Sequence, residues 1–454
     1  MEIKMNLKCV AIACAVLMAG FTSCSNDSDT DNSGIVPNGN STVAKITLMQ
    51  KSNATRDADA KPGATPEESE IKTATLYVFN SEKKLVKQVN FPKGADTQTV
   101  ELTTGTHYFY ALVNSPKVPA IAANTPLEAA TVQAVNEMNL ASLEEINGTE
   151  FGFLMSSLGE PVRIDLVEAV ESQAGTKNPV VLPVGRAMAK VNAKFEIADP
   201  ETDQPITGAL SQVQYQGANN PKAMYQLPNY VGGQLQTPYF KDASVVTNKY
   251  FPKLVDDFTM TDGWVDADGV EANAIYMIEN SNQVPKEGNS SFILLKGLFT
   301  PKAEYCYDGQ TGAPLGQGIP AGTTFWCAFT AEDPDFPVHK RRFYNQQPTA
   351  SVLEELTTLL DDGYNYTLSV EYNNGITYYP FFLRNDAATN DIAKHTTARN
   401  SYYGVTITSV NNLGANTPFG VIPNPETPLG VIAWVEGTIE VLPWNVINQS
   451  GSIQ

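Results

Sequence analysis

Hydrophobic and polar residues alternate over short stretches of the chain, which is the pattern expected of half-buried β-strands. In residues 43–49, Ala44, Ile46 and Leu48 fall on one side of an extended segment, and polar residues fall on the other. Further stretches alternate or are rich in β-branched and aromatic residues, which favour strands. They are residues 71–79, 85–89, 97–102, 107–113, 182–197, 364–372, 376–384, 402–410 and 430–446. The pattern therefore predicts an all-β protein with minor helices.

Two short helices and one tight turn are predicted among the strands. A helix is expected from Thr125 and another over Ser351–Leu360. In each case a Ser or Thr is followed three residues later by Glu, a spacing that caps the first amides of a helix. Asn374-Gly375 is a strong signal for a two-residue hairpin turn, so we expect the segments on its two sides to pair with each other.

The length of 454 residues allows two to three domains, each with its own core. A polar stretch at Asp199-Pro200 interrupts the strand pattern and marks the expected boundary. We therefore predict two β-sandwich domains, at residues 57–199 and 200–454.

The first 24 residues have the features of a bacterial lipoprotein signal peptide. Two lysines precede the apolar run Cys9–Phe21, which is too short to span a bilayer. Small residues then precede Cys24, as in a lipobox. We expect residues 1–24 to end at a lipidated Cys24, and residues 25–56 to form a propeptide that carries the first strand. Plain secretion with cleavage near Ser23 is the alternative.

The composition argues against several functions. The formal net charge is −19, which makes nucleic acid and anionic lipid surfaces poor partners and otherwise favours solubility. The chain contains three histidines, His107, His339 and His395, and has neither Cys-x-x-Cys pairs nor a phosphate-loop glycine spacing. We therefore expect no metal, no cofactor and no catalytic residues, and predict that the protein is not an enzyme.

Two cysteines remain in the body of the chain once the first 24 residues are set aside. Cys306 and Cys327 both lie in strand-like stretches. An exported protein permits a disulfide between them. Two buried thiols are the alternative, and the sequence does not decide between them.

Six short segments resemble a known family when they are taken in order. They are Ala74–Asn80, Gly105–Asn114, Leu154–Ser157, Arg186–Val191, Arg399–Ile407 and Val441–Trp444. Together they resemble the fimbrillins of Bacteroidales, which are the precursors of type V pili. Residues 200–350 match no part of the family pattern.

The resemblance implies two transthyretin-like β-sandwich domains, an outer-membrane lipoprotein intermediate, and cleavage by an arginine-specific protease. Arg56 is the first arginine of the chain and lies in a polar stretch between two strand-like segments, so we expect cleavage between Arg56 and Asp57. Cleavage would remove the first strand and open a groove. A C-terminal strand of another subunit would then fill that groove.

The donor strand is expected within Thr438–Gln454. Its expected apolar anchors are Ile439, Val441, Trp444 and Val446. The alternative is that Thr438–Val446 is a core strand of its own domain.

The sequence therefore predicts a structural subunit of a cell-surface fimbria that supports adhesion. Its expected partners are copies of itself or related subunits, an arginine-specific protease, and outer-membrane lipid during maturation. One alternative is a fimbrial tip or accessory adhesin. Another is a surface lipoprotein that binds glycans, for which exposed aromatic residues such as Trp264 are the support.

Overall fold

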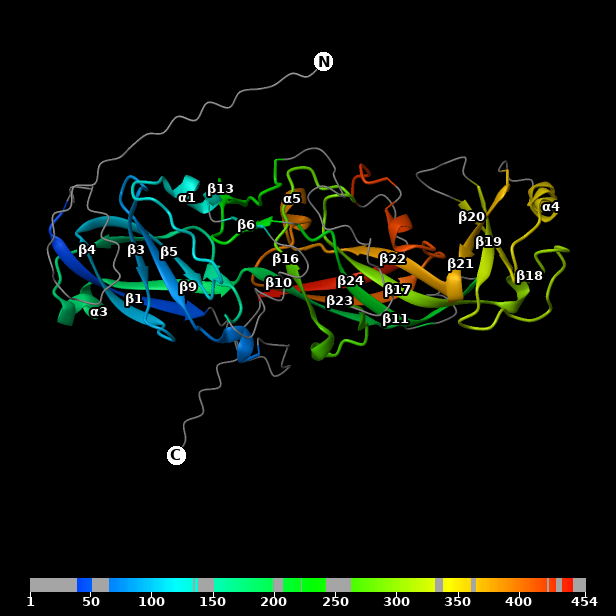
Figure 1. Ribbon diagram of the computed structural model, residues 1–454, viewed down its shortest axis with the longest axis horizontal. Helices are drawn as coiled ribbons and strands as arrows, with labels where there is room; N and C mark the ends of the chain where they lie inside the picture. The colour runs from blue at the N-terminus through cyan, green and yellow to red at the C-terminus, as the bar shows by residue number, and fades with distance from the viewer. Residues whose placement is uncertain are drawn as a thin grey trace, which may run out of the picture. The chain divides into compact units, whose positions relative to one another are not determined.

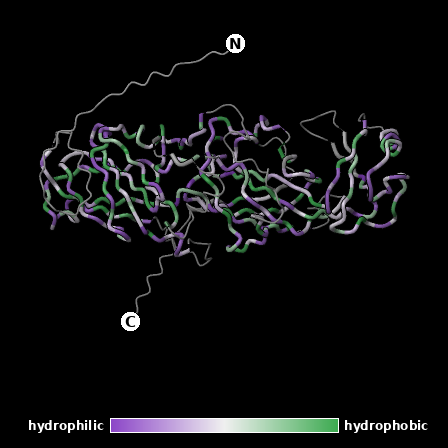
Figure 2. The backbone as a smooth tube through the Cα atoms, viewed as in Figure 1, coloured by the Kyte–Doolittle hydropathy of each residue, from purple (hydrophilic) through white to green (hydrophobic). Residues whose placement is uncertain are grey.

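Strands dominate the computed structural model, and the helices between them are few and short (Figure 1). The prediction of an all-β protein with minor helices is confirmed. The structure describes residues 39–50, 65–133, 135–137, 151–197, 199, 207–221, 223–241, 263–330, 338–360, 365–422, 424–429 and 435–443. Figure 2 shows hydrophobic and hydrophilic residues alternating along many of the strands, as expected where one face is buried.

The first sheet has eight strands, and the inward residues of all of them form one core. Its strands are β1 (Ser41–Gln50), β2 (Ala74–Phe79), β3 (Leu85–Asn90), β4 (Thr97–Thr103), β5 (Gly105–Val113), β7 (Met155–Ser157), β8 (Val162–Leu166) and β9 (Pro179–Arg186). Their order is β3-β2-β5-β7-β9-β1-β4, with β8 paired to β5. Each strand contributes at least one buried apolar residue to the shared core, so the sheet folds around it.

Two four-stranded sheets share a second core and form a β-sandwich. One sheet has the order β16-β10-β23-β24, and the other has the order β15-β11-β17-β22. The strands are β10 (Met188–Phe195), β11 (Gly208–Ala218), β15 (Val265–Asp266), β16 (Ile275–Ile278), β17 (Phe292–Pro301), β22 (Ile376–Phe382), β23 (Ser401–Val410) and β24 (Val435–Pro443). Buried residues from both sheets, such as Val191 and Ile407 from one and Tyr215 and Leu295 from the other, belong to the same core.

A smaller sheet with the order β18-β20-β19-β21 packs against helix α4. Its elements are β18 (Cys306–Tyr307), β19 (Phe325–Thr330), β20 (Val338–Tyr344), β21 (Leu368–Tyr372) and α4 (Ala350–Leu360). The remaining strands are β6 (Val135–Glu137), β12 (Ala223–Tyr225), β13 (Tyr230–Val231) and β14 (Gln234–Leu235). The remaining helices are α1 (Leu127–Gln133), α3 (Ala174–Lys177), α5 (Asp391–Lys394) and the 3₁₀ turns η1 (Glu67–Ser69), η2 (Glu171–Gln173), η3 (Glu271–Asn273), η4 (Ala303–Tyr305), η5 (Asn373–Gly375) and η6 (Pro418–Val421).

The single strand predicted at residues 182–197 is wrong, because the chain breaks there into β9 and β10. The two strands belong to different sheets. At the crossing, Arg186 N donates to Asn400 Oδ1 at 3.1 Å and Asn400 N donates to Met188 O at 2.9 Å. The side chain and backbone of Asn400 therefore satisfy the amide and the carbonyl that flank the break. The residues on both sides of the break, from Val184 to Val191, are all buried, so the burial pattern does not reveal where the chain changes sheet.

The hairpin predicted at Asn374-Gly375 is also wrong, although the chain does turn there. Asn374 and Gly375 have φ values of 52° and 70°, which are the positive values such a turn requires. However, β21 pairs with β19 and β22 pairs with β17. The turn passes the chain from one sheet to another, and no ladder joins the strands on its two sides.

The helix starts differ slightly from those predicted. Helix α4 begins at Ala350, and the Thr349 hydroxyl accepts from Val352 N at 3.4 Å, so Thr349 supplies the cap instead of Ser351. Helix α1 begins at Leu127. The described residues all belong to one compact unit, and the domain boundary at Asp199-Pro200 stays a prediction.

Candidate assembly site

The first strand, β1, lies inside a sheet and not at its edge (Figure 1, dark blue). On one side it pairs antiparallel with β4, from Ser41 opposite Thr103 to Thr47 opposite Thr97. On the other side it pairs parallel with β9. Removing β1 would therefore leave two strand edges without partners, one on β4 and one on β9. Strand β4 has no other neighbour in the described sheet.

The inward face of β1 is buried, which confirms the half-buried strand predicted at residues 43–49. Ala44 and Ile46 are fully buried and Leu48 is nearly so. All three belong to the core of the first sheet. Burying an Ile or Leu side chain contributes about 1.5–3 kcal/mol. We call the space that these side chains fill between β4 and β9 the β1 slot.

One end of the β1 slot is polar and surrounds the Thr42 hydroxyl with hydrogen-bonding groups. The Thr42 hydroxyl donates to Val167 O at 2.6 Å and accepts from Ala169 N at 3.0 Å. Asn178 Nδ2 donates to Thr42 Oγ1 at 3.1 Å and to Val43 O at 3.0 Å. Asn178 is buried, and its Oδ1 accepts from Val167 N at 2.9 Å. We call the hydrogen-bonding groups of Val167, Ala169 and Asn178 the Asn178 port.

The other end of the slot abuts the short turn η1. Gln50, the last residue of β1, donates through Nε2 to Ser69 O. The turn carries a reciprocal capping box, because Thr65 N donates to Glu68 Oε2 at 2.8 Å and Glu68 N donates to Thr65 Oγ1 at 3.4 Å. This turn was not predicted, although Thr65 and Glu68 have the same spacing as the Ser or Thr and the Glu that predicted the two helices.

Buried charges hold η1 in place independently of β1. Arg186 Nε donates to Glu68 O, and its Nη2 donates to Ser69 Oγ, both at 2.9 Å. The Glu68 carboxylate accepts hydrogen bonds from Lys190 Nζ at 2.8 Å and from the Tyr276 hydroxyl at 2.5 Å. Burial lowers the pKa of Arg186 to about 10, and the nearby Glu68 partly offsets this. The Arg186 guanidinium therefore stays charged at neutral pH.

The C-terminal strand β24 is the edge strand of its own sheet. It pairs antiparallel with β23, from Ser401 opposite Pro443 to Val410 opposite Val435. Ile439 packs against the sandwich core. In this structure the described part of Thr438–Val446 is thus a strand of its own domain, which corresponds to the alternative prediction. Val441 lies in β24, although its side chain is not described.

Several predicted site residues lie outside the described residues. They are Cys24, Arg56, Asp57, Trp444 and Val446. Their roles stay predictions.

The disulfide between Cys306 and Cys327 is wrong, and the alternative of two buried thiols holds. Cys306 of β18 and Cys327 of β19 are both paired with Phe343, because β20 lies between β18 and β19 in the sheet. Because neighbouring strands are about 4.8 Å apart, the two backbones are about 9–10 Å apart, whereas a disulfide needs about 4.4–6.8 Å. Burial raises the pKa of Cys327 to about 12, so its thiol is unreactive.

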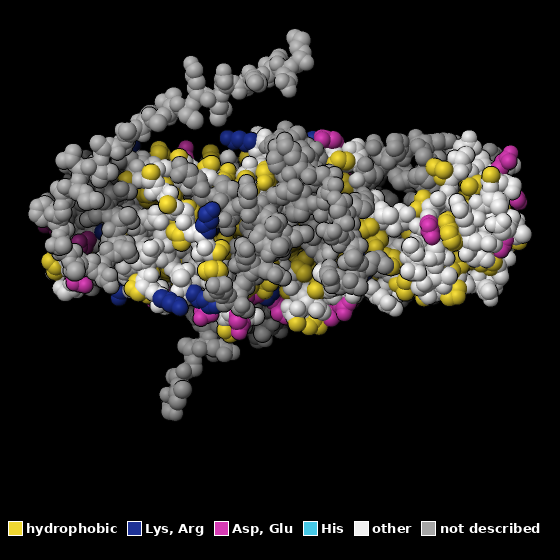
Figure 3. Space-filling model, in the orientation of Figure 1, with side chains coloured by type: hydrophobic (Ala, Val, Ile, Leu, Met, Phe, Trp, Pro, Cys, Tyr) yellow, Lys and Arg dark blue, Asp and Glu magenta, His cyan; other side chains and the backbone are white. Residues whose placement is uncertain are grey.

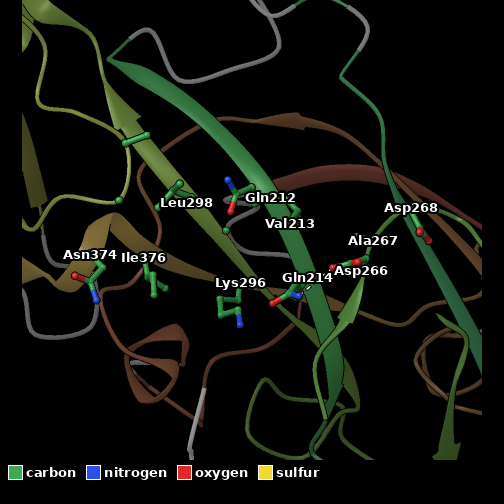
Figure 4. A pocket seen from close by; sticks show the side chains of 13 residues that line it. Gln212, Val213, Gln214, Asp266, Ala267, Asp268, Lys296, Leu298, Asn374 and Ile376 are labelled. Carbon is green, nitrogen blue, oxygen red and sulfur yellow. Dashed lines mark hydrogen bonds between the residues drawn. The ribbon is translucent and has the colours of Figure 1, made fainter. Parts of the chain in front are cut away.

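A separate open pocket of about 900 Å³ lies over β11, β15 and β17 (Figure 4). The polar side chains that line it are those of Gln212, Gln214, Asp266, Asp268, Lys296 and Asn374. Gln212 sits at a β-bulge and has a φ of 51°, an uncommon conformation for a residue other than glycine. Gln214 Nε2 donates to Asp266 Oδ1 at 2.9 Å. No sequence motif predicted this pocket.

Two further observations concern membranes and metals. No helix in the described part of the chain is long and apolar enough to cross a membrane. Within the described ranges, no three His, Cys, Asp or Glu side chains are placed to hold a metal ion.

On the face drawn in Figure 3, the described hydrophobic side chains occur in small groups separated by polar ones.

Comparison with known proteins identifies the family. The family model described as "Major fimbrial subunit protein (FimA)" matches residues 43–194, from β1 to the end of β10. The model described as "Major fimbrial subunit protein type IV, Fimbrillin, C-terminal" matches residues 370–450. Together the two models match slightly more than half of the chain. The chain belongs to the fimbrillin family.

Relatives of this fimbrillin are fimbrial proteins. The minor fimbrium subunit Mfa1 of Porphyromonas gingivalis is 23% identical over 93% of this chain and 90% of the relative. Among solved structures, the fimbrilin FimA of P. gingivalis is similar with a TM-score of 0.48 and 13% identity, over 90% of this chain and 99% of that one. The tip fimbrial protein Mfa3 of P. gingivalis is similar with a TM-score of 0.38 and 12% identity, over 89% and 100% of the two chains.

Membership of the family gives the coarse function of this fimbrillin. Its family consists of structural subunits of fimbriae, which implies a place in a cell-surface fimbria and assembly with related subunits.

Proposed function

We propose that this chain is the precursor of a fimbrial structural subunit that polymerises by exchanging β1 for a strand of another copy. The observation that carries the proposal is the place of β1 inside the first sheet, where it fills an apolar slot between β4 and β9. Unpaired strand edges beside an apolar slot recruit strands from other chains. A fimbrillin that loses β1 would become such an acceptor.

Cleavage within the segment that follows β1 explains how the exchange is controlled. While β1 is covalently joined to the rest of the chain, its effective concentration at the slot is far above that of any competing strand. After cleavage between Arg56 and Asp57, β1 could dissociate and would be diluted. The same cut leaves η1 in the mature chain, where Arg186 and Lys190 hold it. The slot would thus open with loss of the Gln50 contact to Ser69 but without loss of the bonds from Arg186 and Lys190 that hold η1.

The lipid anchor places the precursor at the outer membrane before this step. A diacylglyceryl group on Cys24 would hold the chain there, since each buried CH₂ contributes about 0.8 kcal/mol. Because Cys24 and β1 lie on the same side of Arg56, one cut would release both the anchor and the strand.

Replacing Cys24 with alanine is expected to abolish incorporation of labelled palmitate. The reason is that Cys24 supplies the thiol to which the acyl chains are attached. Metabolic labelling of cells that express the unvaried chain and the C24A variant checks this. Undiminished label in the variant would refute the assignment of Cys24.

Replacing Arg56 with alanine is expected to prevent polymerisation after treatment with an arginine-specific protease. The matched control is Arg163→Ala, which removes an exposed arginine that pairs with Asp165 on the surface. The unvaried and R163A chains should form filaments, as seen by electron microscopy, and R56A should stay monomeric. Filaments from R56A, or the absence of filaments from the unvaried chain, would contradict polymerisation by strand exchange after cleavage at Arg56.

A second candidate function, that of a tip or accessory adhesin which binds a glycan, has one observation in its favour. The pocket in Figure 4 presents amide side chains from Gln212, Gln214 and Asn374 beside two carboxylates and an ammonium group. Amides both donate and accept hydrogen bonds, as recognition of sugar hydroxyls requires. Such a subunit would bind a ligand at this pocket instead of forming long filaments alone.

Calorimetric titration with a panel of neutral oligosaccharides tests the second candidate. If it is correct, one of them should bind, and Gln212→Ala should weaken binding about tenfold by removing the hydrogen-bonding group at the bulge. Gln310→Ala, on an exposed loop outside the pocket, serves as the control and should leave binding unchanged. Absence of binding by every sugar in the panel would dismiss this candidate.

A further inference from the structure

We infer that the Asn178 port selects and aligns the incoming strand, and that Ser450 of a second copy takes the place of the Thr42 hydroxyl. This inference rests on the proposed exchange of β1. It adds the side chain that the acceptor recognises and the direction in which the new strand runs.

The port loses hydrogen-bond partners when β1 leaves. Ala169 N loses the acceptor 3.0 Å away, and Asn178 Nδ2 loses two acceptors, Thr42 Oγ1 and Val43 O. Asn178 cannot turn away to find others, because its Oδ1 stays bonded to Val167 N and its Nδ2 to Val167 O at 2.8 Å. Val167 O takes only one of the two Nδ2 hydrogens, so the other is left without an acceptor, and an unsatisfied buried donor is costly. A strand that brings a hydroxyl to this point is therefore favoured over one that brings a methyl group.

The spacing of β1 defines what else the incoming strand must carry. Its hydroxyl at Thr42 is followed on the same face by large apolar side chains four and six residues later, at Ile46 and Leu48. Side chains two apart share a face of a strand, so only residues of one parity can enter the slot. The predicted anchors Ile439 and Val441 thus cannot enter together with Trp444 and Val446 in an uninterrupted strand.

Two places in residues 438–454 carry this spacing. Read forward, Thr438 is followed by Leu442 and Trp444 four and six residues later. Read backward, Ser450 is followed by Val446 and Trp444 at the same distances.

The forward match is unfavourable for two reasons. It would bring Glu440 to the position of Ala44, which is fully buried, and an unpaired carboxylate there is very costly. It would also pull Thr438 and Leu442 out of β24, where both are paired with β23. The backward match brings Asn448 to the Ala44 position. An uncharged amide costs far less to bury than a carboxylate.

The backward match fixes the direction of the donor strand. With Ser450 at the port and Trp444 at the Leu48 end, the strand runs opposite to β1. It would be antiparallel to β9 and parallel to β4, whereas β1 is parallel to β9 and antiparallel to β4. Residues 444–450 of the second copy would fill the slot, and its β24 would stay in its own sheet.

Competition by a synthetic peptide tests this inference. Unvaried full-length chain is treated with an arginine-specific protease, and its polymerisation is followed by light scattering in the presence of a peptide of residues 442–454. The unvaried peptide should inhibit. Ser450→Ala should raise the half-inhibitory concentration about three- to tenfold, and Ser452→Ala, beyond the port, should leave it unchanged.

The outcomes separate the inference from the proposed function. If the treated chain forms no polymer, the proposed function fails and the inference fails with it. If the chain polymerises and Trp444→Ala weakens the peptide but Ser450→Ala does not, strand exchange stands and recognition at the port is overturned. Equal loss of inhibition with Ser450→Ala and Ser452→Ala would also overturn the assignment of Ser450.

Discussion

Replacing Arg399 with alanine is expected to lower the free energy of unfolding by about 3–5 kcal/mol, because it leaves a buried carboxylate without its partner. Arg399 and Glu279 are both almost fully buried. The two hydrogen bonds between their side chains are 2.8 Å, from Nε to Oε1, and 2.7 Å, from Nη2 to Oε2. The remaining guanidinium donors reach Ser156 Oγ and the carbonyls of Tyr225 and Gln226.

The charge state of Arg399 supports this expectation. Burial alone would lower its pKa, but the Glu279 carboxylate outweighs burial and the pKa is raised. The Arg399 guanidinium therefore stays charged at neutral pH. Arg399 joins segments that are far apart in the sequence, since Ser156 belongs to β7 of the first sheet and Glu279 directly follows β16 of the sandwich.

Urea denaturation of the unvaried chain, R399A and a matched control checks the prediction. The control is Arg163→Ala, because the Arg163–Asp165 pair is similar in length at 3.0 Å but more than half exposed, and its loss should cost no more than about 1 kcal/mol. Removing both partners, with Arg399→Met and Glu279→Met, should cost less than R399A alone. Equal effects of R399A and R163A would show that the buried pair is not what joins these sheets.

Truncation after Pro443 is expected to abolish polymerisation without lowering the free energy of unfolding by more than about 0.5 kcal/mol. It removes the proposed donor residues and leaves β24 and every described contact in place. Light scattering of the protease-treated chain measures assembly, and urea denaturation measures stability.

Truncation after Gly437 is the matched control for that experiment. It removes most of β24 and so exposes the edge of β23 and the core beside Ile439. This shorter chain should be measurably less stable than the chain that ends at Pro443. Filaments from the chain that ends at Pro443 would show that the donor is not the tail that follows it.

The sequence predicted the elements whose side chains alternate between two environments. Strand β1 is the clearest case, because Ala44, Ile46 and Leu48 face the core while Lys45 and Met49 are exposed. Strands β3, β4, β5 and β23 were likewise found close to their true bounds. These elements follow from local polarity, which the sequence records directly.

The sequence did not predict contacts between distant residues. The break between β9 and β10 depends on Asn400, more than 200 residues away, and no local pattern marks it. Thr42 reaches the Asn178 port only through the pairing of β1 with β9, which the sequence does not record. The Asn374-Gly375 turn was predicted, but the strands that pair with β21 and β22 on its two sides were not. The residues of a turn do not determine which sheet each flanking strand joins.

Hydrogen–deuterium exchange at β4 tests the central claim most directly. The amides of β4 that point toward β1 have hydrogen-bond partners in β1 and in no other described strand. Within residues 97–103, exchange of the amides that face β1 should be slow in the uncleaved precursor, where β1 is paired with β4. It should be fast in the cleaved monomer from which β1 has been removed, and slow again in the polymer, where a strand of another copy fills the slot. Fast exchange of residues 97–103 in the polymer would contradict strand exchange at the β1 slot.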